Sequence, residues 1–389
     1  MDNRLNQLIL NKILKNLDLE SIKSCSLVNK QFNKAFNMDI LWHSLFTNHY
    51  DESIDEYKKV FGTDSYKGTY KKYFLLKYLK KTLKLNYTII KLASLKSLDL
   101  SHKNLTSIPA EIRNLISLQE LNLSNNNLTS IPAEIKNLAL LQVLDLCNNS
   151  LKSIPAKMGK IASLKELYLS NNNLTSIPTK IGNLKSLLWL VLSNNNLTSI
   201  PSKIGKLVSL RWLDLSNNKL TSIPSKIKKL VLLKGLSFKY NDLTSIPAEI
   251  GNLAFLKILD LRYNRLKSIP AEIYKIVSLK ELYLSNNNLT SIPAEIGKLV
   301  SLKILDLGYN RLKSISTKIY KLISLQSLDL SHNRLKSIST KIYNLTSLQS
   351  LDLSNNRLKS IPTKKYKLLS LQSLDLSNNR LKNNSNKKI

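Results

Sequence analysis

The chain has 389 residues, 43% of them hydrophobic, which is enough to bury a sizeable core. It contains no apolar run of about 18 residues and no charged leader before an apolar stretch, so the sequence predicts neither a membrane span nor a secretory signal. We therefore expect an intracellular protein, cytoplasmic or nuclear. The net charge of +33 fits a nucleic-acid or acidic partner, but we favour the lysine-, asparagine- and isoleucine-rich composition of AT-rich genomes as its cause.

Residues 1–48 contain no proline and carry apolar residues at helical spacing. This pattern predicts three short helices around a shared core, and Asp18 and Asp39 are suitable helix starts. By themselves these features indicate a small all-α bundle at one end of the chain.

The order of residues in this segment resembles an F-box. The matching features are Ile9-Leu10, Ile13-Leu14, the Asp-Leu-Glu-Ser turn at 18–21, Ser26-Leu27-Val28 and Leu41-Trp42. Asn6 stands where a proline is usual, and Leu8 where an acidic residue is usual. The resemblance implies that the segment binds the adaptor Skp1, which docks on a cullin and a RING protein. The residues that it assigns to this interface are Leu5, Ile9, Leu10, Ile13, Leu14, Leu27, Val28 and Trp42. Val28 and Trp42 can equally be core residues of the bundle.

Residues 49–94 connect this segment to the rest of the chain. They are acidic at first and then basic and aromatic. Tyr73, Leu76, Tyr78, Leu79 and Leu83 form an apolar stripe at helical spacing. We interpret the segment as a helical linker and a cap over the next region, in preference to a helix that lies on a membrane surface.

Residues 95–389 repeat one frame every 23 residues, giving twelve whole repeats and a half repeat. The frame is L-x-x-L-x-L-x-x-N-x-L, and it resembles the leucine-rich repeat. Alternation such as Leu351 and Leu353 predicts a short strand with one buried face, and stacked strands form a parallel sheet. The predicted fold is therefore an α/β solenoid, a leucine-rich-repeat horseshoe, with a small all-α F-box domain at its N-terminus.

Two further columns of the frame have structural roles. A buried asparagine after each strand can bond the backbone of its own and neighbouring turns, and only the first repeat breaks the column, with Lys103. All ten prolines fall in an Ile-Pro step that precedes a short irregular or helical turn on the convex side.

Large aromatic residues occupy the predicted concave face of the middle repeats. Nothing in the frame requires them, and exposed aromatics are typical of binding hot spots. The sequence therefore predicts a protein-binding site there, although tyrosine is also an ordinary strand residue. The aromatic members of this site are Tyr168, Trp189, Trp212, Tyr240, Tyr263, Tyr283 and Tyr309.

An aspartate lies between the inward leucines in eight repeats, and the site includes Asp260, Asp306 and Asp329. Lys257, Lys280 and Lys303 flank this acidic line. Neighbouring aspartates repel each other, and a basic segment of a partner would relieve the repulsion. We therefore expect partner binding to weaken when Asp306 and Asp329 become asparagine. The same line argues against nucleic acid on this face.

No catalytic constellation is recognisable in the sequence. The four histidines are scattered, the two cysteines lie in different regions, and the nine glycines form no phosphate-binding loop. We expect no catalytic residue, no metal and no cofactor, and hence a protein that is not an enzyme.

The combined resemblance implies a substrate receptor of a Skp1–cullin–F-box ubiquitin ligase, whose repeats hold a target protein. A protein-binding scaffold of the Ras-signalling type, without ligase linkage, stays open, because the S-I-P-x-x-I-x-x-L frame also resembles those proteins. A nucleic-acid binder that uses the basic convex side is the third alternative. The near-identical repeats suggest a recently expanded array from an amoeba or a large virus infecting one, in which case the protein acts in the host cell.

Overall fold

A computed structural model gives the structure of the chain, and the residues that it describes are 39, 42, 43, 54–362 and 368–381. The chain divides into two compact units. One comprises Met1–Leu98 and Pro109–Gln119, and the other Asp99–Ile108 and Glu120–Ile389. The outer segment of the first repeat thus belongs with the helices that precede the repeats. No helix among the described residues is long and apolar enough to cross a membrane.

Three helices of the first unit are described, α5 (Ile54–Phe61), α6 (Tyr66–Thr82) and α7 (Ile89–Ala93). Helix α6 begins where the Ser65 hydroxyl accepts a hydrogen bond from the Gly68 N–H at 3.0 Å. It packs against η1, the outer turn of the first repeat, within the same unit. Four residues of the predicted apolar stripe are buried, whereas Tyr78 is exposed because it lies on the opposite side of α6.

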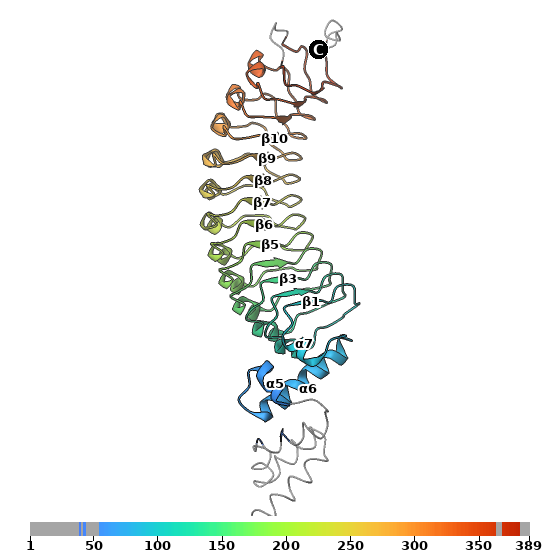
Figure 1. Cartoon of the computed structure of the whole chain (residues 1–389). Coiled ribbons are helices and arrows are strands. Elements are labelled where there is room, and N and C mark those ends of the chain that lie inside the picture. Colours follow the sequence, from blue (N-terminus) through green and yellow to red (C-terminus); the bar gives the residue numbers. More distant parts are fainter. Residues whose placement is uncertain (1–38, 40–41, 44–53, 363–367, 382–389) are drawn as a thin grey trace, which may run out of the picture. The chain divides into compact units, whose positions relative to one another are not determined.

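The repeats form one thirteen-stranded sheet, in which the strands follow each other in sequence order (Figure 1). Equivalent residues of consecutive repeats are paired in parallel, as Leu305 with Leu328. The predicted α/β leucine-rich-repeat solenoid is therefore confirmed, while the predicted all-α domain lies almost entirely outside the described residues. The strands are β1 (Ser97–Asp99), β2 (Glu120–Asn122), β3 (Val143–Asp145), β4 (Glu166–Tyr168), β5 (Trp189–Val191), β6 (Trp212–Asp214), β7 (Gly235–Ser237), β8 (Ile258–Asp260), β9 (Glu281–Tyr283), β10 (Ile304–Asp306), β11 (Ser327–Asp329), β12 (Ser350–Asp352) and β13 (Ser373–Asp375).

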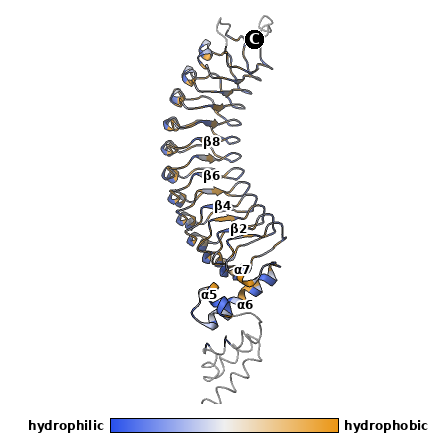
Figure 2. Ribbon diagram, in the orientation of Figure 1, coloured by the Kyte–Doolittle hydropathy of each residue, from blue (hydrophilic) through white to orange (hydrophobic). Residues whose placement is uncertain are grey.

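The core of the solenoid consists of stacked leucine columns. In β10, for example, Leu305 is buried between Ile304 and Asp306, which are only partly buried. Leu307 continues the buried column after the strand. Each repeat of the solenoid combines hydrophobic and hydrophilic residues (Figure 2). Each repeat therefore buries its leucines against the repeats before and after it, and a single repeat has no core of its own.

The buried asparagine column joins consecutive repeats, as the sequence predicts. The Asn218 amide nitrogen donates to the carbonyl oxygens of Leu215 and Ser216 in its own repeat, and to that of Leu192 in the preceding repeat. Its side-chain oxygen accepts the N–H of Leu197 at 3.0 Å. One side chain thus satisfies backbone groups of two repeats that would otherwise be buried without partners.

A 3-10 turn follows the Ile-Pro step on the side of the repeat away from the sheet (Figure 1). In two repeats Ser316 and Ser339 replace the proline, and each hydroxyl accepts a backbone N–H two residues later. The turns are η1 (Ala110–Asn114), η2 (Ala133–Asn137), η3 (Ala156–Lys160), η4 (Thr179–Asn183), η5 (Ser202–Lys206), η6 (Ser225–Lys229), η7 (Ala248–Asn252), η8 (Ala271–Lys275), η9 (Ala294–Lys298), η10 (Thr317–Lys321) and η11 (Thr340–Asn344).

We expect Asn218→Ala to lower the free energy of unfolding by about 3 kcal/mol, because the Leu197 N–H and the carbonyls bonded to Asn218 lose their partner in a buried place. Asn183→Ala is the matched control, since Asn183 is exposed at the end of η4. Urea unfolding followed by circular dichroism measures both. Equal midpoints for the two variants would show that the buried amides do not hold the repeats together.

Candidate protein-binding surface

The aromatic residues predicted to form one cluster fall into two groups. Trp189 and Trp212 occupy the first position of β5 and β6, where they are paired in register. Tyr168 and Tyr283 end β4 and β9. The other three, Tyr240, Tyr263 and Tyr309, lie beyond the strands, in the turn just before the buried asparagine. The seven aromatic residues therefore form a strand group and a turn group, although sequence spacing predicts that all seven lie on one face of the sheet.

Trp212 lies across the neighbouring strand. A Cβ atom added to Gly235 would stand 2.1 Å from the Trp212 ring, so the indole occupies the space that a side chain of β7 would otherwise fill. Both tryptophans are only partly buried. Glycine at this position allows the ring to lie flat on the sheet, and the pair forms an aromatic surface over β5 to β7.

The three turn tyrosines adopt a left-handed backbone conformation, with φ between 50° and 54°. Asparagine fills this position in most other repeats, as expected, because it tolerates positive φ better than tyrosine does. The tyrosine rings are 39% to 50% exposed. Tyr240 stacks on Tyr263 with centroids 4.1 Å apart, and Tyr309 stacks on His332 at 3.8 Å. The unfavourable backbone conformation thus presents large, mutually supported rings to solvent.

The strand-end aspartates have a local structural role that the sequence analysis missed. Each carboxylate accepts the backbone N–H two residues later, as Asp329 accepts that of Ser331 at 2.8 Å. Asn122 makes the same bond to Ser124 at 3.0 Å. Five of the strands end in Asp-x-Ser, a recognised turn signal that could have predicted this bond. The aspartates therefore close the turn after the strand, whether or not they also bind a partner.

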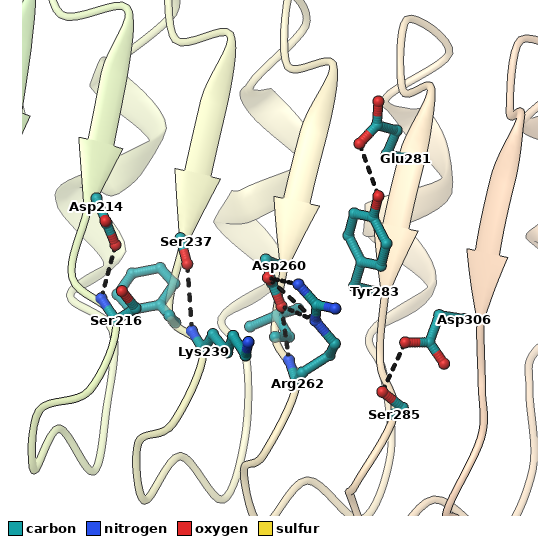
Figure 3. Close-up of polar contacts among 12 residues, drawn as sticks. Asp214, Ser216, Ser237, Lys239, Asp260, Arg262, Glu281, Tyr283, Ser285 and Asp306 are labelled. Atoms are coloured by element: carbon teal, nitrogen blue, oxygen red, sulfur yellow. Dashed lines mark hydrogen bonds and ion pairs between the residues drawn. The ribbon is translucent and has the colours of Figure 1, made fainter. Parts of the chain in front are cut away.

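Asp260 is not available to a partner as the sequence analysis expected, because it is buried and paired (Figure 3). The Arg262 guanidinium donates to both of its carboxylate oxygens, with the closest approach at 2.6 Å. Arg262 also lies 4.4 Å from the centre of the Tyr283 ring. The sequence analysis did not identify Arg262 as the partner of Asp260, although the two residues are only two positions apart in the sequence.

Among the strands that the structure describes, an uninterrupted acidic row exists only in the last repeats. Asp306, Asp329, Asp352 and Asp375 are paired in register on four consecutive strands. Burial and, to a smaller extent, the Asp329 charge raise the pKa of Asp306, although the Ser285 hydroxyl donates to it at 2.6 Å (Figure 3). The pKa of Asp375 is lowered instead, chiefly by the hydrogen bond from the Ser377 N–H.

The strand tyrosines are held by carboxylates of their own strands. The Tyr168 hydroxyl donates to Glu166 at 2.7 Å, and the Tyr283 hydroxyl donates to Glu281 at 2.9 Å. Burial is the main cause that raises the pKa of Tyr283 to about 12, and the Glu281 bond adds to it. Both phenols therefore stay neutral and keep a fixed direction on the sheet.

Among the described residues, no group of three or more His, Cys, Asp or Glu side chains is arranged to hold a metal ion. Burial raises the pKa of the Cys147 thiol to about 11, so this thiol is protonated at neutral pH and a poor nucleophile. The surface can therefore contact a partner through aromatic rings, through charged side chains and through carboxylates that are already bonded to the backbone.

Of the eight residues predicted to bind Skp1, only Trp42 lies among the described residues. Its side chain is 2% exposed and packs against Tyr70 of α6 with ring centroids 5.1 Å apart. Trp42 is therefore a core residue of the first unit in this structure. The predicted interface residues outside the described residues are Leu5, Ile9, Leu10, Ile13, Leu14, Leu27 and Val28.

Comparison with known proteins agrees with both parts of the chain. An F-box-like family model matches residues 8–48. A leucine-rich repeat protein of Leptospira interrogans is 36% identical, with a TM-score of 0.60, and the match covers 78% of this chain and 88% of that one. The chain belongs to the leucine-rich repeat family. The repeat models that match are a leucine-rich repeat region over 110–192 and 225–317, and leucine-rich repeats over 323–381, 94–115, 186–207 and 209–230.

Other solved leucine-rich repeat structures are similar over the same part of the chain. The plant peptide hormone receptor RGFR1, in complex with RGF2, is 34% identical with a TM-score of 0.63, and the match covers 73% of this chain and 47% of the receptor. The leucine-rich repeat domain of APL1B is 26% identical with a TM-score of 0.66, over 76% of this chain and 86% of that one. No curated protein matches the sequence. An F-box-like segment followed by leucine-rich repeats indicates a role in protein interaction or substrate recognition.

The raised pKa of Asp306 predicts how its stability effect depends on pH. The ionised carboxylate of Asp306 destabilises the folded chain at neutral pH. This effect begins to fade as the pH falls through the raised folded-state pKa, and it is gone below the ordinary pKa of an aspartate in the unfolded chain. We expect Asp306→Asn to raise the urea midpoint at pH 7 and to give no advantage at pH 3. Asp375→Asn is the control, with the opposite sign at pH 7, because its folded-state pKa is lowered. Shifts in the same direction would contradict this account.

We expect the acidic row to bind a basic segment, and labelled octalysine is a suitable probe. The overall charge of +33 repels this peptide, so binding must come from a local acidic surface. Replacing Asp306 and Asp329 by asparagine should weaken binding several-fold while the turns persist, because Asn122 holds the same bond. Fluorescence anisotropy measures the affinity. Unchanged affinity of the double variant would exclude the acidic row as a binding site.

Proposed function

We propose that this leucine-rich repeat protein is the substrate-recognition subunit of a Skp1–cullin–F-box E3 ubiquitin ligase. The observation that supports this proposal most directly is the order of its parts, an F-box-like match at 8–48 followed by an array of repeats. In such a subunit the F-box segment binds a Skp1-like adaptor, and the repeats bind the protein to be modified.

The exposed rings of the repeats fit the substrate-binding half of this function. Tyr240, Tyr263 and Tyr309 present large apolar area to solvent, and the two tryptophans of β5 and β6 extend it over the sheet. Aromatic side chains contribute strongly to protein–protein affinity, because they bury large areas with little loss of conformational freedom.

The chain itself would not catalyse ubiquitin transfer. The reactive cysteines would belong to other subunits of the ligase, and this chain would supply proximity and orientation by holding adaptor and substrate at once. This function places the protein in the cytoplasm or nucleus, where Skp1 and cullin complexes act.

The proposal is tested by a pull-down of the intact chain with purified Skp1, beside a Leu10→Asp, Leu14→Asp double variant. An aspartate at an apolar interface leaves a desolvated charge without a partner, so we expect binding to fall at least tenfold. Trp42 is left unchanged, because its buried ring packs on Tyr70 and its loss would disturb the fold.

Circular dichroism and the thermal midpoint of the double variant serve as the folding control. Loss of Skp1 binding with an unchanged midpoint supports the ligase function. Absence of Skp1 binding by the intact chain would contradict it, and a protein-binding scaffold without ligase linkage would then be the better description of the chain.

A further inference from the structure

Five basic residues form a continuous row where the chain enters strands β6 to β10. The backbone N–H of each residue donates to the carbonyl of the residue before it in the row, at 2.8 Å in all four steps, so the five lie on neighbouring strands. With a strand separation of about 4.8 Å, the row is about 19 Å long. We call it the basic ladder, and its members are Arg211, Lys234, Lys257, Lys280 and Lys303.

No acidic group within the described part of the chain forms an ion pair with the ladder. The two ion pairs found there, Arg262 with Asp260 and Arg265 with Asp242, do not involve it. Glu281 follows a ladder residue directly, but its carboxylate accepts the hydroxyl of Tyr283. The four lysines of the ladder are exposed and Arg211 is partly buried, so five like charges lie side by side where the chain enters adjacent strands.

The repeat frame does not require these charges. Five other repeats carry glutamine at the same position, and their strands pair in the same register. Like charges directly opposite on neighbouring strands repel each other, so the ladder costs free energy that glutamine avoids. The glutamines are Gln119, Gln142, Gln326, Gln349 and Gln372.

Exposed apolar side chains lie along the chain just before the ladder residues. We call them the apolar ridge, and its most exposed member is Phe255 at 57%. Most repeats place serine where Leu232 and Phe255 stand. The Ser278 hydroxyl, for example, donates to backbone carbonyls of the preceding repeat. The remaining members of the ridge are Val208, Val231, Leu232, Val277 and Val300.

Apolar side chains also follow the ladder on its other side. Trp212, Ile258 and Ile304, each next in sequence to a ladder residue, are half-buried on the sheet. The charges are therefore flanked by apolar groups in both directions. The flanks are mainly aliphatic, and nucleic acid, whose bases stack on aromatic rings, covers aliphatic side chains poorly. A membrane would reach the projecting ridge but not the half-buried groups on the sheet. An extended acidic segment of about six residues matches the length of the row, at about 3.3 Å per residue.

We propose that the basic ladder and the apolar ridge bind an acidic segment of a partner protein, with apolar side chains between or beside its carboxylates. Carboxylates of the segment pair with the ladder, and its apolar side chains cover Phe255 and Leu232. The inference rests on the proposed function at one point only, which is that the partner is a substrate of the ubiquitin ligase.

The test selects a random twelve-residue peptide library, displayed on phage, against the intact chain. Enriched peptides are then synthesised and titrated by fluorescence anisotropy. We expect them to be acidic and to contain leucine, phenylalanine or tryptophan. Because the whole chain is basic, acidity alone is not decisive, and the variants below carry the test.

The ladder variant is Lys234→Gln, Lys257→Gln, Lys280→Gln, which installs the residue that other repeats already carry. The charge-matched control is Lys313→Gln, Lys336→Gln, Lys359→Gln, which removes three exposed lysines from the outer segments. We expect the ladder variant to lose at least tenfold in affinity and the control less than twofold. Leu232→Ser with Phe255→Ser should also weaken binding, by about tenfold, and no variant should have a lower thermal midpoint than the parent.

Equal losses in the ladder variant and its control would overturn the proposal, as would enrichment of neutral or basic peptides or of none. Phosphatidylserine vesicles and duplex DNA are titrated alongside. If either binds through the ladder while the peptides do not, the occupant is a membrane or a nucleic acid and the proposal is wrong. None of these measurements involves Skp1, so failure here and failure of the ligase function are distinguishable.

Discussion

The amide of the buried asparagine is the interaction on which the repeats depend. It bonds carbonyls of its own turn and both a carbonyl and an N–H of the preceding one, so each repeat is closed only when its neighbour is in place. These bonds connect residues at fixed offsets, and an inserted or deleted residue between them would leave buried backbone groups unpaired. The repeat length is therefore constrained throughout the interior, and variation is confined to side chains that point away from the core.

Because every repeat meets the same constraint, the repeats can be compared with one another position by position. Where one repeat carries tyrosine, lysine or tryptophan and another carries asparagine, glutamine or serine in the same fold, the difference is not needed for folding. The largest departures gather around β7, where Gly235 accommodates the Trp212 ring and Lys239 lies beside the stacked Tyr240 and Tyr263. The surface around β7, which departs most from the repeat frame, is therefore the part of the array best suited to recognise a specific partner.

The leucine, asparagine and proline columns could be predicted from the sequence, because each is imposed by backbone burial and recurs at a fixed period. The sheet surface was harder to predict. Asp260 occupies a position that the period predicts to be exposed, but Arg262 covers it. Tyr240 occupies a predicted strand position, but its backbone is left-handed. Such details depend on side-chain partners between positions, which a period does not encode. Trp42 illustrates the same limit, since apolar spacing cannot distinguish a residue of an interface from one packed on Tyr70.

The two charged rows of the sheet share only the repeat that contains β10, and this arrangement has a physical consequence. The basic ladder ends at Lys303, in the same repeat where the uninterrupted aspartates begin at Asp306. Beyond that repeat the entry position is glutamine, so the aspartates have no facing lysines on their own strands. At physiological ionic strength, charges more than ~8 Å apart are largely screened from each other. The rows therefore interact directly only around β10, and a change in one row leaves most of the other's field intact. A partner segment that follows the sheet from β6 to β13 meets first positive and then negative charge. A segment with opposite charges at its two ends can therefore pair with both rows in one orientation only.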